Sequence, residues 1–247
     1  MQHILSRRSR PVLKRFAEAN TLLGFDFDGT LAPIVADRHR AVMRRSTKTL
    51  LARLAARYPC VVISGRARKD VLARLRGVGM RGIVGNHGIE PWSSLPALER
   101  KVRGWVSQLR RSLQHLAGVA VEDKRFSVTV HYRRAHRKAQ ALTAIRAAAR
   151  GLGALRVVGG KQVVNILPAG APHKGTALQR ELRKLRCERA IYTGDDDTDE
   201  DVFSLSRPAR LLTVRVGRKS SSRARYYVRS QREIDRFLRT LLELRRK

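Results

Sequence analysis

The residues that could do chemistry begin with a pair of aspartates near the start of the chain. Asp26 and Asp28 stand in the run FDFDGTL, directly after the apolar segment Thr21–Phe25. Two carboxylates at this spacing, where a strand unwinds into a turn, can take different roles, one as a nucleophile and the other as a proton carrier. The alternative is a plain Asx turn at a strand end. The Gly-Thr-Leu that follows favours a reactive site.

A second acidic cluster lies far downstream. The chain has only 20 Asp and Glu residues, yet six of them fall within seven consecutive positions: Asp195, Asp196, Asp197, Asp199, Glu200 and Asp201. Like charges this close repel one another, and a bound hard cation would offset the repulsion. The alternative is an acidic loop that balances a basic surface. The particular flanking pattern favours the metal.

Alternating strands and helices must position these clusters. Strands are expected at Thr21–Phe25, Cys60–Ile63, Gly82–Val84, Ala190–Tyr192 and Leu211–Val216, and helices at Ser46–Arg57, Arg68–Leu75, Lys174–Leu185, Asp199–Leu205 and Gln231–Leu244. This alternation is typical of a parallel sheet covered on both faces. Ligands of such sheets bind beyond the carboxyl ends of the strands, so Asp26 and Asp28 should face a crevice there.

The middle of the chain has a different pattern. Helices are expected at Pro96–Leu116 and Ala135–Arg150, and strands at Val119–Glu122, Phe126–Tyr132, Leu155–Val158 and Gln162–Ile166. The pair Gly159-Gly160 predicts a hairpin turn between the last two strands. This αββαββ order indicates a small inserted sheet that is open on one face. The expected domains are a core of residues 1–92 and 169–247 and a cap of residues 93–168.

Four segments in order resemble the motifs of the haloacid dehalogenase (HAD) superfamily of phosphotransferases. They are the run around Asp26 and Asp28, Ser64-Gly65-Arg66, Lys174, and the acidic run from Asp195. The runs GDDDTDE, GNHGIE and HYR further resemble the trehalose-phosphate phosphatase branch. The resemblance covers about Leu22 to Leu205. It implies an α/β fold, with a HAD-like Rossmannoid parallel core sheet and an inserted α+β cap.

The resemblance also implies a mechanism and a cofactor. Asp26 would be the nucleophile that forms an aspartyl phosphate, Asp28 the general acid and base, and Lys174 the cation that neutralises the phosphate. Mg²⁺ would be held by Asp26, the main-chain carbonyl of Asp28 and Asp195, with Asp196 as a further candidate. Asp199 would be an orienting carboxylate. The implied reaction is hydrolysis of trehalose 6-phosphate to trehalose and phosphate.

The residues expected to bind the substrate lie in both parts of the chain. They are Ser64, Gly65, Arg66, His87, Glu90, Lys124, Arg125, His131, Arg133 and Asn165. For each of the later charged residues, a plain surface charge is an equal alternative. The family usually has a glutamate at the position of Asn165 and an aspartate at that of His173. The amide at Asn165 leaves another sugar phosphate open as the substrate.

Composition bounds the remaining possibilities. The 247 residues carry 53 Lys and Arg against 20 Asp and Glu, for a net charge of +33. Such a charge attracts anions, so nonspecific nucleic-acid binding at low salt is an alternative function, although a solvated cationic surface accounts for it more simply. No apolar run reaches membrane-span length and no signal peptide is evident, so a cytoplasmic monomer is expected. Cys60 and Cys187 are read as buried thiols, and no P-loop occurs.

Overall fold

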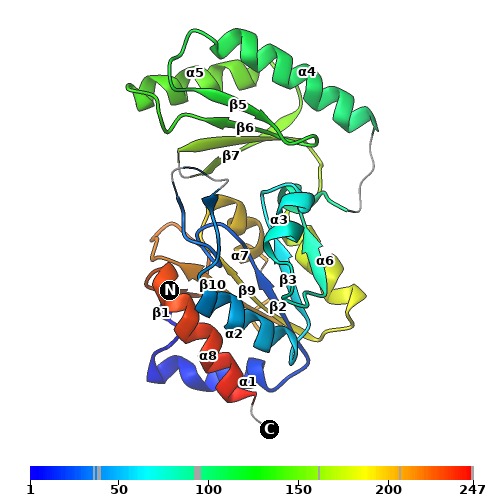
Figure 1. Ribbon diagram of the computed structural model, residues 1–247, viewed down its shortest axis with the longest axis vertical. Helices are drawn as coiled ribbons and strands as arrows, with labels where there is room; N and C mark the ends of the chain where they lie inside the picture. Colours follow the sequence, from blue (N-terminus) through cyan, green and yellow to red (C-terminus); the bar gives the residue numbers. More distant parts are fainter. Residues whose placement is uncertain (36, 38–39, 92–95, 161, 206, 246–247) are drawn as a thin grey trace. The chain divides into compact units, whose positions relative to one another are not determined.

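The chain folds into two compact units. The computed structural model describes residues 1–35, 37, 40–91, 96–160, 162–205 and 207–245 (Figure 1). Met1–Gly88 and His173–Lys247 together form the larger unit, and Ile89–Pro172 form the smaller unit. The smaller unit is therefore an insertion in the sequence of the larger one.

A seven-stranded parallel sheet forms the centre of the larger unit. Across the sheet, the strands are β1 (Gln2–His3), β11 (Tyr226–Val228), β10 (Leu211–Val216), β9 (Arg189–Gly194), β2 (Thr21–Phe25), β3 (Cys60–Ile63) and β4 (Gly82–Val84). Every residue of β2, β3 and β10 is buried, which is the pattern of strands covered on both faces. The expected α/β class with a parallel core sheet is confirmed.

Helices of the larger unit cover both faces of this sheet. They are α1 (Arg10–Ala17), α2 (Arg45–Ala55), α3 (Arg68–Arg74), α6 (Lys174–Lys184), α7 (Glu200–Phe203) and α8 (Ile234–Leu244). Helices α1, α2 and α8 share one hydrophobic core with Leu23 and Phe25 of β2. Leu178 of α6 packs near Gly24, which points to the opposite face. Figure 1 shows α2 beside α8.

Helix α8 is fixed by its apolar face and by one partly buried carboxylate. Its buried residues recur at helical spacing: Ile234, Phe237, Leu238, Leu241 and Leu242. At its first turn, the carboxylate of Asp235 accepts hydrogen bonds from the Thr47 hydroxyl at 2.5 Å, the Ser46 hydroxyl at 2.7 Å and the Arg44 guanidinium at 3.1 Å. Partial burial by itself would raise the pKa of Asp235, but the hydrogen bonds from Thr47, Ser46 and Arg44 lower it below its ordinary value.

Replacing Asp235 with asparagine should therefore reduce the free energy of unfolding by about 1–3 kcal/mol at pH 7. A carboxyl with a lowered pKa stabilises the fold above its unfolded pKa, and this contribution disappears as pH falls through the folded pKa. Urea unfolding at pH 7 and in acid should show the difference only at pH 7. Glu243→Gln, at an exposed site of the same helix, is the control. An equal loss in both variants would contradict this account.

The smaller unit is a four-stranded antiparallel sheet with two helices. The strands lie in the order β5 (Ala120–Asp123), β6 (Val128–His131), β8 (Val163–Pro168) and β7 (Leu155–Gly160). Helices α4 (Pro96–Leu113) and α5 (Lys138–Arg150) pack on one face of the sheet, where Trp105 and Ile145 join its core. The expected αββαββ order is present.

The hairpin of the smaller unit differs from the sequence-based expectation. Gly159 pairs with Val164 and Gly160 with Val163, so the two glycines belong to β7 and not to the turn. The turn comes later in the chain, where Gln162 has the positive φ of 64°. Because a residue other than glycine adopts this left-handed conformation, the glycine pair predicted the turn two residues too early.

Candidate active site

The first aspartate of the proposed site lies where β2 ends. The N–H of Asp26 still donates to the carbonyl of Thr193 on the neighbouring strand β9, at 2.8 Å. The side chain is 6% exposed, and its Oδ1 accepts from Nζ of Lys174 at 2.7 Å. Among the described residues, none donates to Oδ2. This second oxygen therefore remains available at the carboxyl edge of the sheet.

Lys174 is brought to Asp26 by the start of α6. His173 begins this helix with a capping box, in which its ring accepts from the N–H of Gly175 and its own N–H donates to the Thr176 hydroxyl. Lys174 is 1% exposed, and its ammonium also donates to Oδ1 of Asp199 at 2.8 Å. One buried cation thus bridges two buried carboxylates.

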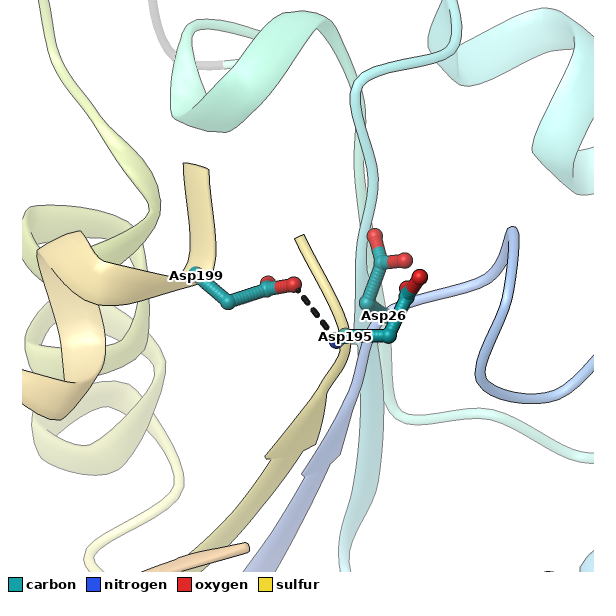
Figure 2. A group of neighbouring side chains, drawn as sticks. All are labelled: Asp26, Asp195 and Asp199. Atoms are coloured by element: carbon teal, nitrogen blue, oxygen red, sulfur yellow. Dashed lines mark hydrogen bonds between the residues drawn. The ribbon is translucent and has the colours of Figure 1, made fainter. Parts of the chain in front are cut away.

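Asp199 organises the loop that follows β9. Its Oδ1 accepts from Lys174 and from the hydroxyl of Tyr192 at 2.7 Å. Its Oδ2 accepts from the N–H groups of Asp195 and Asp196, both at 2.9 Å, and Figure 2 shows the first of these bonds. Four hydrogen bonds occupy this carboxylate, so its role is to shape the loop.

Burial and neighbouring charges shift the pKa values of Asp26 and Lys174. Burial, only partly offset by Lys174 and reinforced by Asp199 and Asp195, raises the pKa of Asp26 well above its ordinary range. Burial alone would lower the pKa of Lys174, but Asp199 and Asp26 raise it well above its ordinary value. Two of the three buried carboxylates therefore share one ammonium, and a further cation would favour the ionised forms of all three.

The donor set fits a hard cation. Oxygen atoms of Asp26, Asp195 and Asp199 all lie within 4.8 Å of one another, and Figure 2 shows the three side chains. Because Asp199 already accepts four hydrogen bonds, Asp26 and Asp195 are the carboxylates suited to Mg²⁺. A Cβ at Gly29 would lie 2.1 Å from Oδ2 of Asp195, so only glycine fits beneath this carboxylate.

Asp28 and Asp196 have other partners for their side chains. Both oxygens of Asp28 accept from the guanidinium of Arg66, at 2.6 and 2.7 Å. Oδ1 of Asp196 accepts from the N–H of Asp197 at 2.8 Å. Neither side chain belongs to the three-carboxylate group. Their expected part in holding the metal stays a prediction.

The segment after β3 lies at the same edge of the sheet. Ser64 is 1% exposed, and its hydroxyl accepts from the N–H of Arg66 at 3.2 Å. Arg66 also donates to Asp70 at 2.6 Å, so the guanidinium is anchored on its far side from Asp28. A Cβ at Gly65 would meet the ring of His87 at 2.5 Å, which places His87 against this turn.

The remaining predicted substrate-binding residues lie in the smaller unit. Asn165 on β8 is buried, and its Oδ1 accepts from the hydroxyl of Thr129 on β6 at 2.9 Å. It alternates with residues packed under the helices, so it faces the other side of the sheet, as His131 does. His131 contacts Glu122 at 2.8 Å, and the exposed Arg125 pairs with Glu99. Lys124, Arg133 and Glu90 are half-buried.

Two polar residues near the cluster were not singled out from the sequence. Tyr192 is fully buried on β9, and its hydroxyl bonds Asp199. Arg215 is 5% exposed on β10, and it donates to the carbonyl of Asp195 at 2.6 Å. Both stand in otherwise apolar runs, where a buried phenol or guanidinium needs a partner. That need is the signal that could have marked them.

Comparison with known protein families shows which family the chain belongs to. The family model described as trehalose-phosphatase matches residues 24–232. The chain belongs to the trehalose-phosphatase family. The match includes all the motif residues discussed above, from Asp26 to Asp199.

Individual relatives of this trehalose-phosphatase family member are consistent with that placement. A trehalose-phosphate phosphatase of Mycolicibacterium paratuberculosis is 38% identical over 205 residues, which are 74% of this chain and 50% of that protein. The chain thus spans about half the length of the curated relatives it matches. The C-terminal domain of C. albicans trehalose-6-phosphate phosphatase superposes with a TM-score of 0.78 at 22% identity, over 95% of this chain and 96% of that one.

A HAD subclass IIB sugar phosphatase shares the fold as well. It has a TM-score of 0.59 at 17% identity, over 89% of this chain and 98% of that one. The HAD-like fold expected for a trehalose-phosphatase family member is therefore confirmed. In the part of the chain that the structure describes, no helix combines the length and apolarity needed to cross a bilayer.

Proposed function

We propose that this protein is a Mg²⁺-dependent phosphatase that hydrolyses trehalose 6-phosphate through a phosphorylated Asp26. The observation that carries the proposal is the buried contact of Lys174 with both Asp26 and Asp199, beside Asp195, at the carboxyl edge of a parallel sheet. Membership in the trehalose-phosphatase family supplies the substrate class. A phosphatase needs this combination of a nucleophile and fixed positive charge.

In the first step, an oxygen of the Asp26 carboxylate attacks the phosphorus atom. The bond from phosphorus to the sugar oxygen breaks, and protonated Asp28 gives its proton to that oxygen as the sugar leaves. The products of the step are an aspartyl phosphate on Asp26, ionised Asp28 and the free sugar. Since Arg66 holds both oxygens of Asp28, one of these contacts must yield when the proton is delivered.

In the second step, a water molecule attacks the phosphorus atom of the aspartyl phosphate. Asp28 accepts a proton from that water, and the bond from phosphorus to the Asp26 oxygen breaks. Inorganic phosphate leaves, and both aspartates return to their starting forms. One carboxyl group thus serves as the acid and then as the base.

The other residues of the site stabilise charge. Lys174 would neutralise the phosphoryl oxygens as well as Asp26, and the Ser64 hydroxyl would donate to a phosphoryl oxygen. Asp26, the main-chain carbonyl of Asp28 and Asp195 would hold Mg²⁺, which supplies further positive charge against the phosphoryl group.

We assign the choice of sugar to the smaller unit. Asn165 and His131 lie on the sheet face opposite the helices, where amide and imidazole groups can bind sugar hydroxyls. Because an amide stands where the family usually has a glutamate, a different sugar phosphate is the main rival substrate. Release of phosphate from a panel of sugar phosphates tests this directly. If trehalose 6-phosphate is hydrolysed more slowly than another sugar phosphate of the panel, the substrate assignment is wrong.

Removal of the metal is expected to abolish turnover. With EDTA, release of phosphate from trehalose 6-phosphate should fall to background, and excess Mg²⁺ should restore it. Ca²⁺ should restore little turnover. It needs more oxygen ligands than Mg²⁺, at longer distances, and this site offers few. Undiminished turnover in EDTA would contradict the proposed metal requirement.

The charge of the chain favours a second candidate function. A net charge of +33 would bind phosphodiester backbones and release their counterions, so affinity for DNA or RNA would fall steeply with salt. Titration of a fluorescent duplex at several salt concentrations measures that slope. Tight duplex binding in a protein without phosphatase activity would favour this candidate over the first.

A further inference from the structure

Arg215 is an unusual residue for its position. It lies on β10, whose six residues are all buried, and its own side chain is 6% exposed. A guanidinium is seldom buried without partners, since leaving water is unfavourable for a charge. Its environment must therefore supply acceptors, and the three that it contacts among the described residues belong to the acidic run 195–201 after β9.

The guanidinium of Arg215 binds the main chain of that loop. One nitrogen, Nη2, donates to the carbonyl of Asp195 at 2.6 Å. The other, Nη1, donates to the carbonyl of Asp196 at 3.3 Å and to the carboxylate of Glu200 at 3.0 Å. Glu200 in turn accepts from the N–H of Arg223 at 2.9 Å, so this ion pair is itself held in place.

The loop is consequently fixed from two sides. Beyond the end of β9, the N–H groups of Asp195 and Asp196 both donate to Asp199. Their carbonyl groups both accept from Arg215, which comes from the next strand. Arg215 pairs with Gly194 in the β9–β10 register, directly before the loop. The four main-chain polar groups that orient the Asp195 carboxylate thus have charged partners, whose hydrogen bonds are stronger than neutral ones.

We propose that Arg215 is a positioning residue for the metal site, which rests on the proposed function. Loss of Arg215 should change the metal affinity in the direction opposite to that expected from its charge alone. Removing a positive charge near a divalent cation would by itself tighten binding of that cation. Removing the fork that holds the loop would instead free the Asp195 carboxylate from its position and weaken binding. The sign of the change therefore separates positioning from charge.

The test is Mn²⁺ binding, followed by electron paramagnetic resonance without substrate. Arg215→Met should weaken the affinity about 10–100-fold, the usual effect of losing a residue that orients a ligand. Arg215→Lys, which keeps the charge but not the planar fork, should show an intermediate loss and should serve if the methionine variant folds poorly. Arg210→Met is the matched control, because Arg210 is exposed and donates to the carbonyl of Glu188 just before the other end of β9.

Three outcomes would overturn the inference. The first is unchanged or tighter Mn²⁺ binding in both Arg215 variants. The second is a loss of Mn²⁺ affinity in Arg210→Met equal to that in Arg215→Met. The third is a loss of affinity in Arg215→Lys as large as that in Arg215→Met. Each of them leaves the proposed phosphatase intact if the unaltered protein binds Mn²⁺. Failure of the unaltered protein to bind Mn²⁺ would overturn the metal-dependent function itself, and the positioning role with it.

Discussion

Asp26→Asn should lower turnover of trehalose 6-phosphate by at least about 10⁴-fold, the scale of losing a nucleophile. The amide nitrogen cannot attack phosphorus, and the amide has the same shape as the carboxyl group. The fold should survive, because the raised pKa of Asp26 means that the folded protein disfavours its charge. An acid of this kind reduces stability above its unfolded pKa, so at pH 7 in EDTA the variant should be at least as stable as the parent.

A neighbouring aspartate provides the control for this prediction. Asp197 lies in the same acidic loop, but its carboxylate is 40% exposed and pairs with Lys219. Asp197→Asn should retain turnover within a few-fold, since exposed ion pairs contribute about 1 kcal/mol or less. Near-normal turnover in a folded Asp26→Asn protein would contradict the assignment of the nucleophile.

Lys174→Met should impair both turnover and stability. Loss of the cation would lower turnover about 10²–10³-fold, the usual effect of removing one stabilising group from the transition state. It would also leave Asp26 and Asp199 buried without their partner, which typically reduces the free energy of unfolding by about 3–5 kcal/mol. Phosphate release and urea unfolding measure the two effects. An exposed counterpart, Lys219→Met, should change stability by less than about 1 kcal/mol.

The stability effect of Lys174 has a second check. In the Lys174→Met background, Asp26→Asn removes one of the two buried carboxylates that have lost the ammonium, so it should raise the free energy of unfolding by more than it does in the parent, without recovering turnover. An equal effect of Asp26→Asn on stability in both backgrounds would show that the two residues do not interact. That result would contradict the ion pair seen between them.

The strands that carry the site follow from local sequence. Thr21–Phe25, Cys60–Ile63, Gly82–Val84 and Leu211–Val216 are apolar runs with clear ends, and the sequence predicts their bounds to the residue. Helix bounds agree to within a few residues, because their apolar spacing shows the buried face and not the final turn. The order of the motifs then places their polar residues at one edge of the sheet.

Contacts between distant segments were beyond local patterns. Strand β1 has two residues and exists because Gln2 and His3 pair with Tyr226 and Tyr227, which no local signal shows. Arg215 reads as a charged residue within a strand until its carbonyl partners are known. The pairing of Asp28 with Arg66 joins residues 38 positions apart. Such pairings form only in the assembled sheet. Sequence patterns therefore identify the reactive residues better than the residues that hold them in place.

Trapping the phosphorylated enzyme tests whether Asp26 is the nucleophile. Acid quenching during turnover of trehalose 6-phosphate, reduction with borohydride and peptide mass spectrometry convert a phosphorylated aspartate into homoserine at its position. We expect homoserine at residue 26 in the parent protein, none in Asp26→Asn, and none when substrate is omitted. Homoserine at another aspartate, or active enzyme that never yields it under the quench, would contradict a phosphorylated Asp26.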